Sequence, residues 1–455
     1  MSRNLKQAAL ARKRGQAPPP GLGGPDFKCV GSGGVSDRLN AYPHFMKQFR
    51  GALYVGVARP VERAGETGDL DLRARIHALS GGVWSETQRS GVARGAREAG
   101  YGGCAEFQGA TDASPALYVS TIAPARGACG LLRCADGEEF SPVALPPEFK
   151  DAASLQALTP FKGRLFGSLA GPGEVGRIVE TRDPASGRWA AANAAGFGDK
   201  GNLGAVTMAV FAGRLYAGIA NPDGFQLWRT DAEGDAPGRW MKLIDGGAGR
   251  GAENRSLASM CVHKDALYLG GGSPIGGIAT TANAGAFGPE LIRINEDESW
   301  DLIVGAGRLT PDGPRQPLSY FGPGFDSLCA GSYWSMGSSN GWLYVGAYKW
   351  SLMNGGASGE NPDLARRFHG RLSTDGIAPK LAGGELYRSA DGENWIPVTT
   401  DGFGNPDNCG ICAIEPTPAG LAVGTANPYA PKTAPASKQP ARGGFDIWVG
   451  ERTGG

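Results

Sequence analysis

One short pattern recurs along the chain in a fixed register, and it constrains the fold more than any other feature of the sequence. An apolar pair, Leu followed by Tyr, Phe or Ala, occurs in seven copies whose leucines are 48 to 78 residues apart. Gly or Ser lies three positions after each leucine, and Pro lies seven positions after it in six copies. Self-similarity at such a period indicates a chain built from repeated structural units. The leucines are Leu53, Leu117, Leu165, Leu215, Leu267, Leu343 and Leu421.

Each copy divides into four short segments that are rich in β-branched and aromatic residues and bounded by Gly, Pro, Asn or Asp, which is the pattern of β-strands. In the fourth copy these segments are 206–211, 214–220, 225–230 and 240–244. The recurrent proline fits the end of the second strand, where the ladder no longer needs an N–H. Four-stranded units of about 50 residues, repeated around an axis, are typical of a β-propeller. The sequence therefore predicts an all-β fold, a seven-bladed β-propeller of four-stranded antiparallel blades.

The last copy offers only three strands, and this predicts how the ring closes. Its strands are expected at 411–415, 420–425 and 445–449. Segment 27–31 has the pattern of a strand, and its pairing with 445–449 would complete the last blade and remove an exposed sheet edge. We expect residues 1–24 to form a flexible tail and residues 25–455 a single domain, with a long inserted loop at about 347–383.

Composition and charge exclude several classes of protein. Glycine supplies 75 of the 455 residues, but 41% hydrophobic residues, including 10 Trp and 17 Phe, are enough to form a core. The 45 Lys and Arg against 44 Asp and Glu leave a net charge of +1, so the sequence predicts no nucleic acid and no membrane as a partner. No run of 18 apolar residues occurs, and no apolar run follows the basic N-terminal stretch. We expect a cytoplasmic protein with reduced cysteines.

The turns between the third and fourth strands carry a motif. The sequence Ser-Ala-Asp-Gly-Glu-Asn-Trp at 389–395 resembles the Asp-box, or BNR, repeat of sialidase-like β-propellers, with weaker copies at 134–140, 181–189 and 230–240. The resemblance implies a fold, because in that family these turns lie on the face opposite the active site. Enzymatic members carry an Arg-Ile-Pro motif, and the nearest string here, Ala-Arg-Pro at 58–60, lacks the Ile. The sialidase catalytic motif is therefore not expected.

Long loops are expected on one face of the predicted propeller. Strand direction alternates, so the connections from second to third strand and from fourth to first strand share a face. The longest of these connections are 85–103, 270–289, 305–331, 346–384 and 424–444. Long loops on a rigid scaffold are where binding usually occurs. We predict that this loop-rich face and the mouth of the central channel bind the ligand.

Asparagine recurs at this face. It lies 13 positions before the leucine in four copies, just before the innermost strand. These amides have two interpretations, because they would either bond a ligand on the axis or cap the turns between blades by bonding neighbouring backbone. The same two interpretations apply to Asn six positions after the leucine. The residues are Asn40, Asn202, Asn254 and Asn408 in the first set, and Asn221 and Asn427 in the second.

Aromatic and basic residues are also frequent in these loops. Rings interleaved with guanidinium groups suit a sugar or a planar anionic molecule, although the rings would also serve to pack the loops onto the blades. The further candidate ligand-binding residues are Arg255, Asp326, Tyr333, Trp334 and Trp350. Arginines in the same loops include Arg94, Arg97, Arg308, Arg366 and Arg367.

Cysteine and histidine do not form a recognisable metal motif. Cys409 and Cys412 make a C-x-x-C, but three residues of extended strand span roughly 10 Å, too far for a disulfide. There is no second C-x-x-C for a structural zinc. A thiol cluster of Cys104, Cys329 and Cys409 at the channel mouth is an alternative. The four histidines, His44, His77, His263 and His369, fall at unequal heights, so no four-His iron site is expected. No metal and no cofactor is predicted.

Three functions are consistent with this pattern. The first is a binding or accessory propeller that presents its loop-rich face and channel mouth to a glycan, a small molecule or a partner protein. The alternative is an enzyme, a hydrolase, lyase or cyclase, acting on a ligand in the central pocket with carboxylates such as Asp223 or Asp326. The third is a structural subunit of an assembly.

Overall fold

A computed structural model gives the structure of most of the chain. It describes residues 19–59, 71, 73–89, 100–122, 129–171, 174–272, 288–327, 329–351, 381–429 and 443–451. Apart from short helical turns, these segments are β-strands that pair antiparallel, which confirms the predicted all-β class. The turns are η1 (Gly24–Asp26), η3 (Pro147–Phe149), η4 (Pro184–Ser186), η5 (Ala195–Gly198), α2 (Gly246–Gly249), η6 (Gly251–Glu253) and η7 (Pro323–Asp326).

The strands pair in groups of four, here numbered units 1 to 7 in the order of their first strands. The first strands are β2 (Tyr42–Phe49), β6 (Gly100–Phe107), β10 (Ser154–Phe161), β14 (Gly204–Phe211), β18 (Ser256–His263), β24 (Ala330–Ser339) and β28 (Gly410–Thr417). The second strands are β3 (Ala52–Ala58), β7 (Ala116–Ile122), β11 (Arg164–Ala170), β15 (Arg214–Ala220), β19 (Ala266–Gly272), β25 (Trp342–Lys349) and β29 (Gly420–Ala426).

The third and fourth strands complete each group. The third strands are β4 (Arg75–Ser80), β8 (Leu131–Cys134), β12 (Arg177–Thr181), β16 (Gln226–Thr230), β20 (Leu291–Asn295), β26 (Glu385–Ser389) and β30 (Ile447–Gly450). The fourth strands are β5 (Val83–Arg89), β9 (Ser141–Val143), β13 (Ala190–Ala191), β17 (Met241–Ile244), β21 (Trp300–Val304), β27 (Trp395–Thr399) and β1 (Phe27–Gly31). A separate hairpin joins β22 (Arg308–Thr310) and β23 (Gly313–Arg315).

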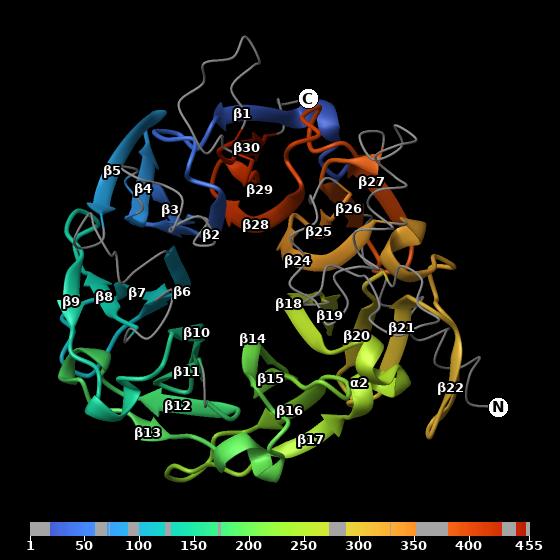
Figure 1. Ribbon diagram of the computed structural model, residues 1–455, viewed down its shortest axis with the longest axis horizontal. Coiled ribbons are helices and arrows are strands. Elements are labelled where there is room, and N and C mark those ends of the chain that lie inside the picture. Colours follow the sequence, from blue (N-terminus) through green and yellow to red (C-terminus); the bar gives the residue numbers. More distant parts are fainter. Residues whose placement is uncertain are drawn as a thin grey trace.

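The units follow one another around a common centre, with the first strand of each unit innermost (Figure 1). The chain ends meet in unit 7, where Phe27 pairs with Gly450 and Lys28 with Val449. The predicted pairing of the two ends is therefore confirmed, with β30 at 447–450. Of the segment 1–24, residues 19–24 are described, and Leu22 is buried with its N–H donating to Tyr344 Oη at 3.0 Å. This segment takes the place of the turn that joins third and fourth strands in the other units.

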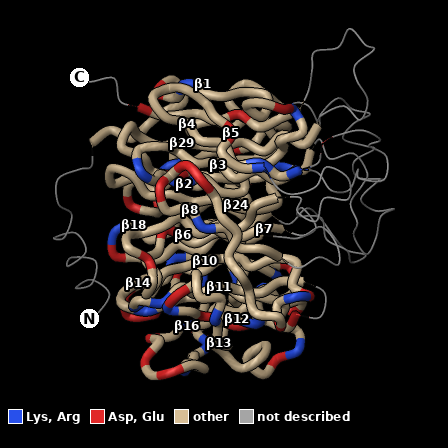
Figure 2. Tube along the Cα trace, turned by 90° about the vertical axis from the view of Figure 1, so that its left-hand side faces the viewer, with Lys and Arg blue, Asp and Glu red and all other residues tan. Residues whose placement is uncertain are grey.

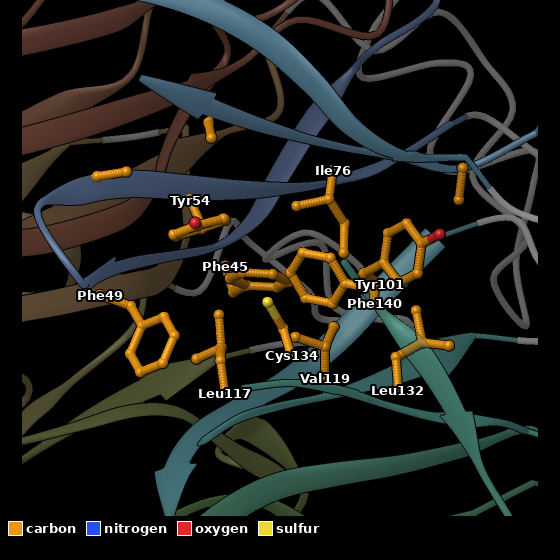
Figure 3. Packing of buried hydrophobic residues seen from close by; sticks show 13 residues of the cluster. Phe45, Phe49, Tyr54, Ile76, Tyr101, Leu117, Val119, Leu132, Cys134 and Phe140 are labelled. Carbon is orange, nitrogen blue, oxygen red and sulfur yellow. The ribbon is translucent and has the colours of Figure 1, made fainter. Parts of the chain in front are cut away.

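The hydrophobic cores lie between neighbouring units. Figure 3 shows the cluster between units 1 and 2, in which Phe45 and Phe49 of β2 face Leu117 and Val119 of β7. The aromatic residue of the repeated pair reaches toward the next unit: Tyr54 Oη donates to the carbonyl of Gly137 in the third-to-fourth-strand turn of unit 2. Because each sheet buries both faces against its neighbours, the apolar pair must recur in every unit.

The Asp-box-like turn of unit 6 shows why its residues are required. Asp391 Oδ1 accepts from the N–H of Glu393 at 2.9 Å and of Asn394 at 2.8 Å. Gly392 has a φ of +78°, and a Cβ there would collide with Tyr268 Oη of unit 5. The turn is thus fixed by side chain to backbone bonds and fits only glycine against the neighbouring tyrosine.

The charged residues are distributed without a dominant sign. Figure 2 shows Lys and Arg interspersed with Asp and Glu along the tube. Within the described segments, no helix has the length and apolar character needed to cross a bilayer.

Candidate functional site

Each of the seven innermost strands contains a β-bulge, seen as a shift in its pairing with the second strand. A bulge adds a residue to one strand and re-aims a side chain. In five units the extra residue lies nine positions before the repeated leucine, and in units 2 and 3 the shift spans two residues. We call these residues the bulge ring: His44, Gly102 and Gly103, Ala157 and Leu158, Val206, Ala258, Trp334 and Cys412.

Most bulge-ring residues contact solvent although they lie on the innermost strands. Trp334 and Cys412 are partly exposed, each between two buried neighbours. His44 is exposed between two buried neighbours, and Val206 is 42% exposed. Leu158 is the exception, because it is buried in the cluster between units 2 and 3. The exposed and partly exposed bulge residues lie on the strands that surround the common centre (Figure 1).

The aromatic and polar side chains of the bulge ring lie on one side of it. The adjacent units 6, 7 and 1 contribute Trp334, Cys412 and His44. The remaining four units contribute only glycine and aliphatic residues. Aromatic, thiol and imidazole groups therefore lie in three adjacent units, and the other four units contribute no polar side chain to the ring.

His44 is the most distinctive member of the ring. Desolvation by the surrounding protein lowers the pKa of its imidazole to about 4, so that it is neutral at pH 7. No described residue forms a hydrogen bond with either ring nitrogen of His44. The ring of Tyr42 lies 5.8 Å from that of His44, centroid to centroid. A neutral imidazole offers one donor and one acceptor, and here both are available to a ligand.

Aromatic rings adjoin His44. Trp334 packs on Tyr348 of β25 with centroids 4.7 Å apart and meets the edge of Tyr42 at 6.2 Å. The indole also lies close to the backbone of Gly410. A Cβ added at Gly410 would lie only 2.9 Å from Trp334 Cε3. Trp350 belongs to the same buried cluster, so the structure brings together two of the predicted site residues, Trp334 and Trp350.

Three thiols lie in this cluster. Cys412 Sγ contacts the carbonyl oxygens of Pro43 at 3.6 Å and Gly424 at 3.7 Å. Burial raises the pKa of Cys409 to about 12 and of Cys329 to about 11. Cys409 and Cys412 are both free thiols. The predicted thiol cluster is met in part, because Cys329 and Cys409 share this cluster whereas Cys104 packs against the core between units 1 and 2.

An ion pair lies on the same side, three residues farther along the innermost strands. Lys47 Nζ is 3.3 Å from Glu415 Oε1, which also accepts from the Gln48 N–H at 3.1 Å. Burial raises the pKa of Glu415, with Lys47 acting in the opposite direction. The two charges neutralise each other next to the bulge ring.

The recurrent asparagines form a second set of groups at the same end of the strands, and we call them the Asn clasps. Asn408 Nδ2 donates to the carbonyl of Gly402 at 3.0 Å and to Asp446 at 2.9 Å. Its Oδ1 accepts from Asn427 Nδ2 at 3.2 Å. Each clasp joins the turn before the innermost strand to the region where the third strand of the same unit begins.

The same arrangement recurs in three other units. Asn202 Nδ2 donates to Gly196 O and Gln226 Oε1, and its Oδ1 accepts from Asn221. Asn254 Nδ2 donates to Gly247 O at 3.2 Å and lies 3.4 Å from Glu290 Oε2. All four leading asparagines are buried. These bonds favour the turn-capping interpretation, and ligand binding by the clasps stays a prediction.

Charged side chains surround the clasp of unit 1. Asn40 Nδ2 donates to Gly34 O and lies 3.4 Å from His77 Nε2, while its Oδ1 accepts from Arg59 Nε at 3.0 Å. Arg59 also pairs with Asp37 at 2.9 Å and is buried. The arginine of the Ala-Arg-Pro string is thus bound within the protein. Burial lowers the pKa of His77 to about 4.

The other predicted site residues lie apart from the bulge ring. Tyr333 is fully buried between units, 5.4 Å from the Phe325 ring. Arg255 Nε donates to Ala252 O, and Asp326 accepts from the N–H of Gly322, so each is bonded within its own loop. Ligand binding by these three residues stays a prediction.

Several candidates cannot be placed. Arg94, Arg97, Arg366, Arg367 and His369, and the stretch 352–380 of the expected insertion, lie outside the described residues. Arg308 is described and binds Glu290 through both terminal nitrogens. In the part of the chain that the structure covers, no three His, Cys, Asp or Glu side chains are arranged to hold a metal ion.

The sequence analysis did not identify the bulge ring, although five of its members lie at one fixed distance from the repeated leucines. His44, Trp334 and Cys412 all lie nine positions before a repeated leucine, as do Val206 and Ala258. No residue type is shared at this position, so a search for recurrent residues passes over it. Counting which position changes most between copies would have found it.

Comparisons with known proteins found solved structures of low similarity and no family. No family model matches the chain, and no curated protein matches it. The structure is similar to the extracellular domain of a protein described as a hybrid two-component system from B. thetaiotaomicron, with 10% identity and a TM-score of 0.46 over 90% of this chain and 40% of that one. It is also similar to Trypanosoma rangeli sialidase, with 11% identity and a TM-score of 0.40 over 68% of this chain and 52% of that one. A protein of unknown function from Dyadobacter fermentans has 13% identity and a TM-score of 0.40, over 73% and 95%.

This chain therefore spans about half or less of the first two structures. At these identities and TM-scores, neither a fold nor an activity is carried over from them to this chain.

Proposed function

We propose that the chain is a closed seven-bladed β-propeller forming one domain from residue 25 onward. Support comes from the pairing of β1 with β30 and from the succession of units around one centre (Figure 1). Deletion of residues 1–31 would leave β30 as an unpaired edge, and we expect aggregation or loss of cooperative unfolding. Deletion of residues 1–18 removes no described contact and serves as the control. A shortened protein lacking 1–31 that unfolds like the control would contradict closure.

We propose that the protein binds a small molecule on the axis, at the side of the bulge ring formed by units 1, 6 and 7. The observation that carries this proposal is the state of His44. Its side chain is exposed and has no hydrogen-bond partner among the described residues, and desolvation by the surrounding protein lowers its pKa to about 4. Trp334 and Tyr42 supply ring faces and edges beside it. Convergent rings and a few unpaired polar groups in a concave place are the usual composition of a ligand site.

The test is a ligand-observed NMR screen of sugars and heteroaromatic fragments, with each hit repeated on Val206→Trp. Val206 stands across the ring from His44, and an indole there would fill the space on the axis. Val83→Trp, a matched change at a 68% exposed position on an outer strand, is the control. We expect hits to lose binding in Val206→Trp and to keep it in Val83→Trp. Hits unaffected by Val206→Trp would contradict this location.

A second function, catalysis at the same place, is favoured by Glu415. Its carboxyl has a raised pKa and lies on an innermost strand beside Lys47, and such a group can act as a general acid. The enzyme would be a hydrolase, lyase or cyclase. Each bound hit would be followed by NMR for turnover, and Glu415→Gln should abolish any turnover while leaving binding. Turnover that persists in Glu415→Gln would remove this residue from the reaction.

A further inference from the structure

The charges around the bulge ring restrict the ligand. No member of the ring is a Lys, Arg, Asp or Glu, and its one imidazole is neutral at pH 7. The thiol of Cys412 contacts two carbonyl oxygens, and burial raises its pKa, so it adds no charge. The ring therefore presents polar groups without presenting a charge.

The nearest charged groups have partners with one exception, because the exposed Glu106 of β6, near Cys104, forms no ion pair with a described residue. Lys47 and Glu415 pair with each other three residues beyond His44 and Cys412. Arg59 pairs with Asp37 and donates to Asn40. An anionic ligand would lose hydration on binding here and would find no free cation among the described side chains around the ring, which is unfavourable. A cationic ligand would also lose hydration, and the one unpaired carboxylate described nearby, Glu106, lies three residues beyond the bulge of unit 2.

We propose that the site selects an uncharged ring compound bearing hydroxyl or amide groups, with the ring against Trp334 and a hydrogen bond to His44. The inference rests on the proposed binding site. It names the class of ligand from three features of the described residues: the aromatic surface, the unpartnered imidazole, and the absence of any charged side chain from the ring itself. A ring face suits the indole, because carbohydrate and heteroaromatic rings both pack on aromatic surfaces.

Two matched series of probes test the class. The first is glucose, glucuronate and glucosamine, and the second is indole-3-acetamide, indole-3-acetate and tryptamine, each neutral, anionic and cationic in turn. Dissociation constants are measured by titration NMR at pH 7. We expect at least one neutral probe to bind about tenfold or more tightly than both charged members of its series. Equal or tighter binding of a charged member overturns the proposal, as does a lack of binding by both neutral probes.

A charged variant makes the test independent of absolute affinity. Val206→Lys places an unpaired cation in the ring at a position that is already 42% exposed. We expect the anionic member to gain about tenfold relative to its neutral analogue, with Val83→Lys unchanged. An unchanged preference in a Val206→Lys protein that retains its wild-type melting temperature overturns the proposal.

The two proposals fail differently. Charged and neutral probes that bind equally well, and that are all lost in Val206→Trp, leave the site correct and the ligand class wrong. Probes that bind with their charge preference intact in Val206→Trp place the site elsewhere.

Discussion

The Asn clasps and the bulge ring lie at the same end of the innermost strands, four residues apart in the sequence, and differ in one respect. In the clasps, polar groups of the buried amides bond to turn carbonyls and to side chains of the same unit, as at Asn408. In the bulge ring, His44 is exposed and forms no hydrogen bond with described residues. The clasp amides are buried and their bonding capacity is used within the protein, whereas the bonding capacity of His44 is not used by any described residue.

The largest effect is expected from removing a clasp. Asn408→Ala leaves Gly402 O, Asp446 and Asn427 without their partner in a buried place, which should cost about 2–4 kcal/mol of unfolding free energy. Urea denaturation measures the loss. Asn394→Ala, a change at an exposed amide that bonds Asp391 in the turn of unit 6, is the control. A loss below about 1 kcal/mol would make the clasps dispensable and weaken the distinction drawn above.

A second prediction concerns acid sensitivity of the unit 1 clasp. His77 is buried and its pKa is lowered to about 4, so the unfolded chain binds a proton at a higher pH than the folded chain. Its contribution to stability is full above about pH 6.5 and is lost as the pH falls toward 4, by roughly 3 kcal/mol at most. Urea unfolding of wild type and His77→Gln at pH 7, 5.5 and 4.5 should show a shallower acid decline in the variant. Parallel declines would show that His77 is not responsible.

A smaller effect is expected when only the indole of the ring is moved. A Cβ in Gly410→Ala would approach Trp334 Cε3 to 2.9 Å and displace the ring. We expect an approximately tenfold weaker affinity for any ligand of the bulge ring, equivalent to about 1.4 kcal/mol. Gly404→Ala is a matched control for added volume, since nothing lies within 4 Å of its Cβ, although its positive φ makes a small loss of stability expected. Unchanged affinity in Gly410→Ala would remove Trp334 from the site.

The sequence predicted the strands well because their register is local. In unit 4, segments 206–211, 214–220, 225–230 and 240–244 correspond to β14 to β17 within two residues at each end. Turns and alternating apolar residues mark such boundaries directly. The pairing of β1 with β30 was also predictable, because the last copy offered only three strands.

The site was predicted less well, for a physical reason. The sequence showed Asn408 and Asn202 in register, but their partners Asp446 and Gln226 become neighbours only when the third strand has folded back against the second. The bulge at Trp334 is likewise a property of pairing between two strands. Neither feature can be recognised in a single segment of the sequence. His44 was therefore considered only as one of four histidines for a metal site, and not as a ligand-binding residue.

The most direct test of the account compares two single changes in unit 1, His44→Ala and Asn40→Ala, measured for stability and for affinity toward the tightest ligand of the bulge ring. We predict that His44→Ala changes the unfolding free energy by less than about 0.5 kcal/mol and weakens binding about tenfold or more. Asn40→Ala should lose about 2 kcal/mol or more of stability and retain the affinity of its folded fraction. The opposite result, binding that depends on Asn40 and not on His44, would contradict the assignment of function to the bulge ring.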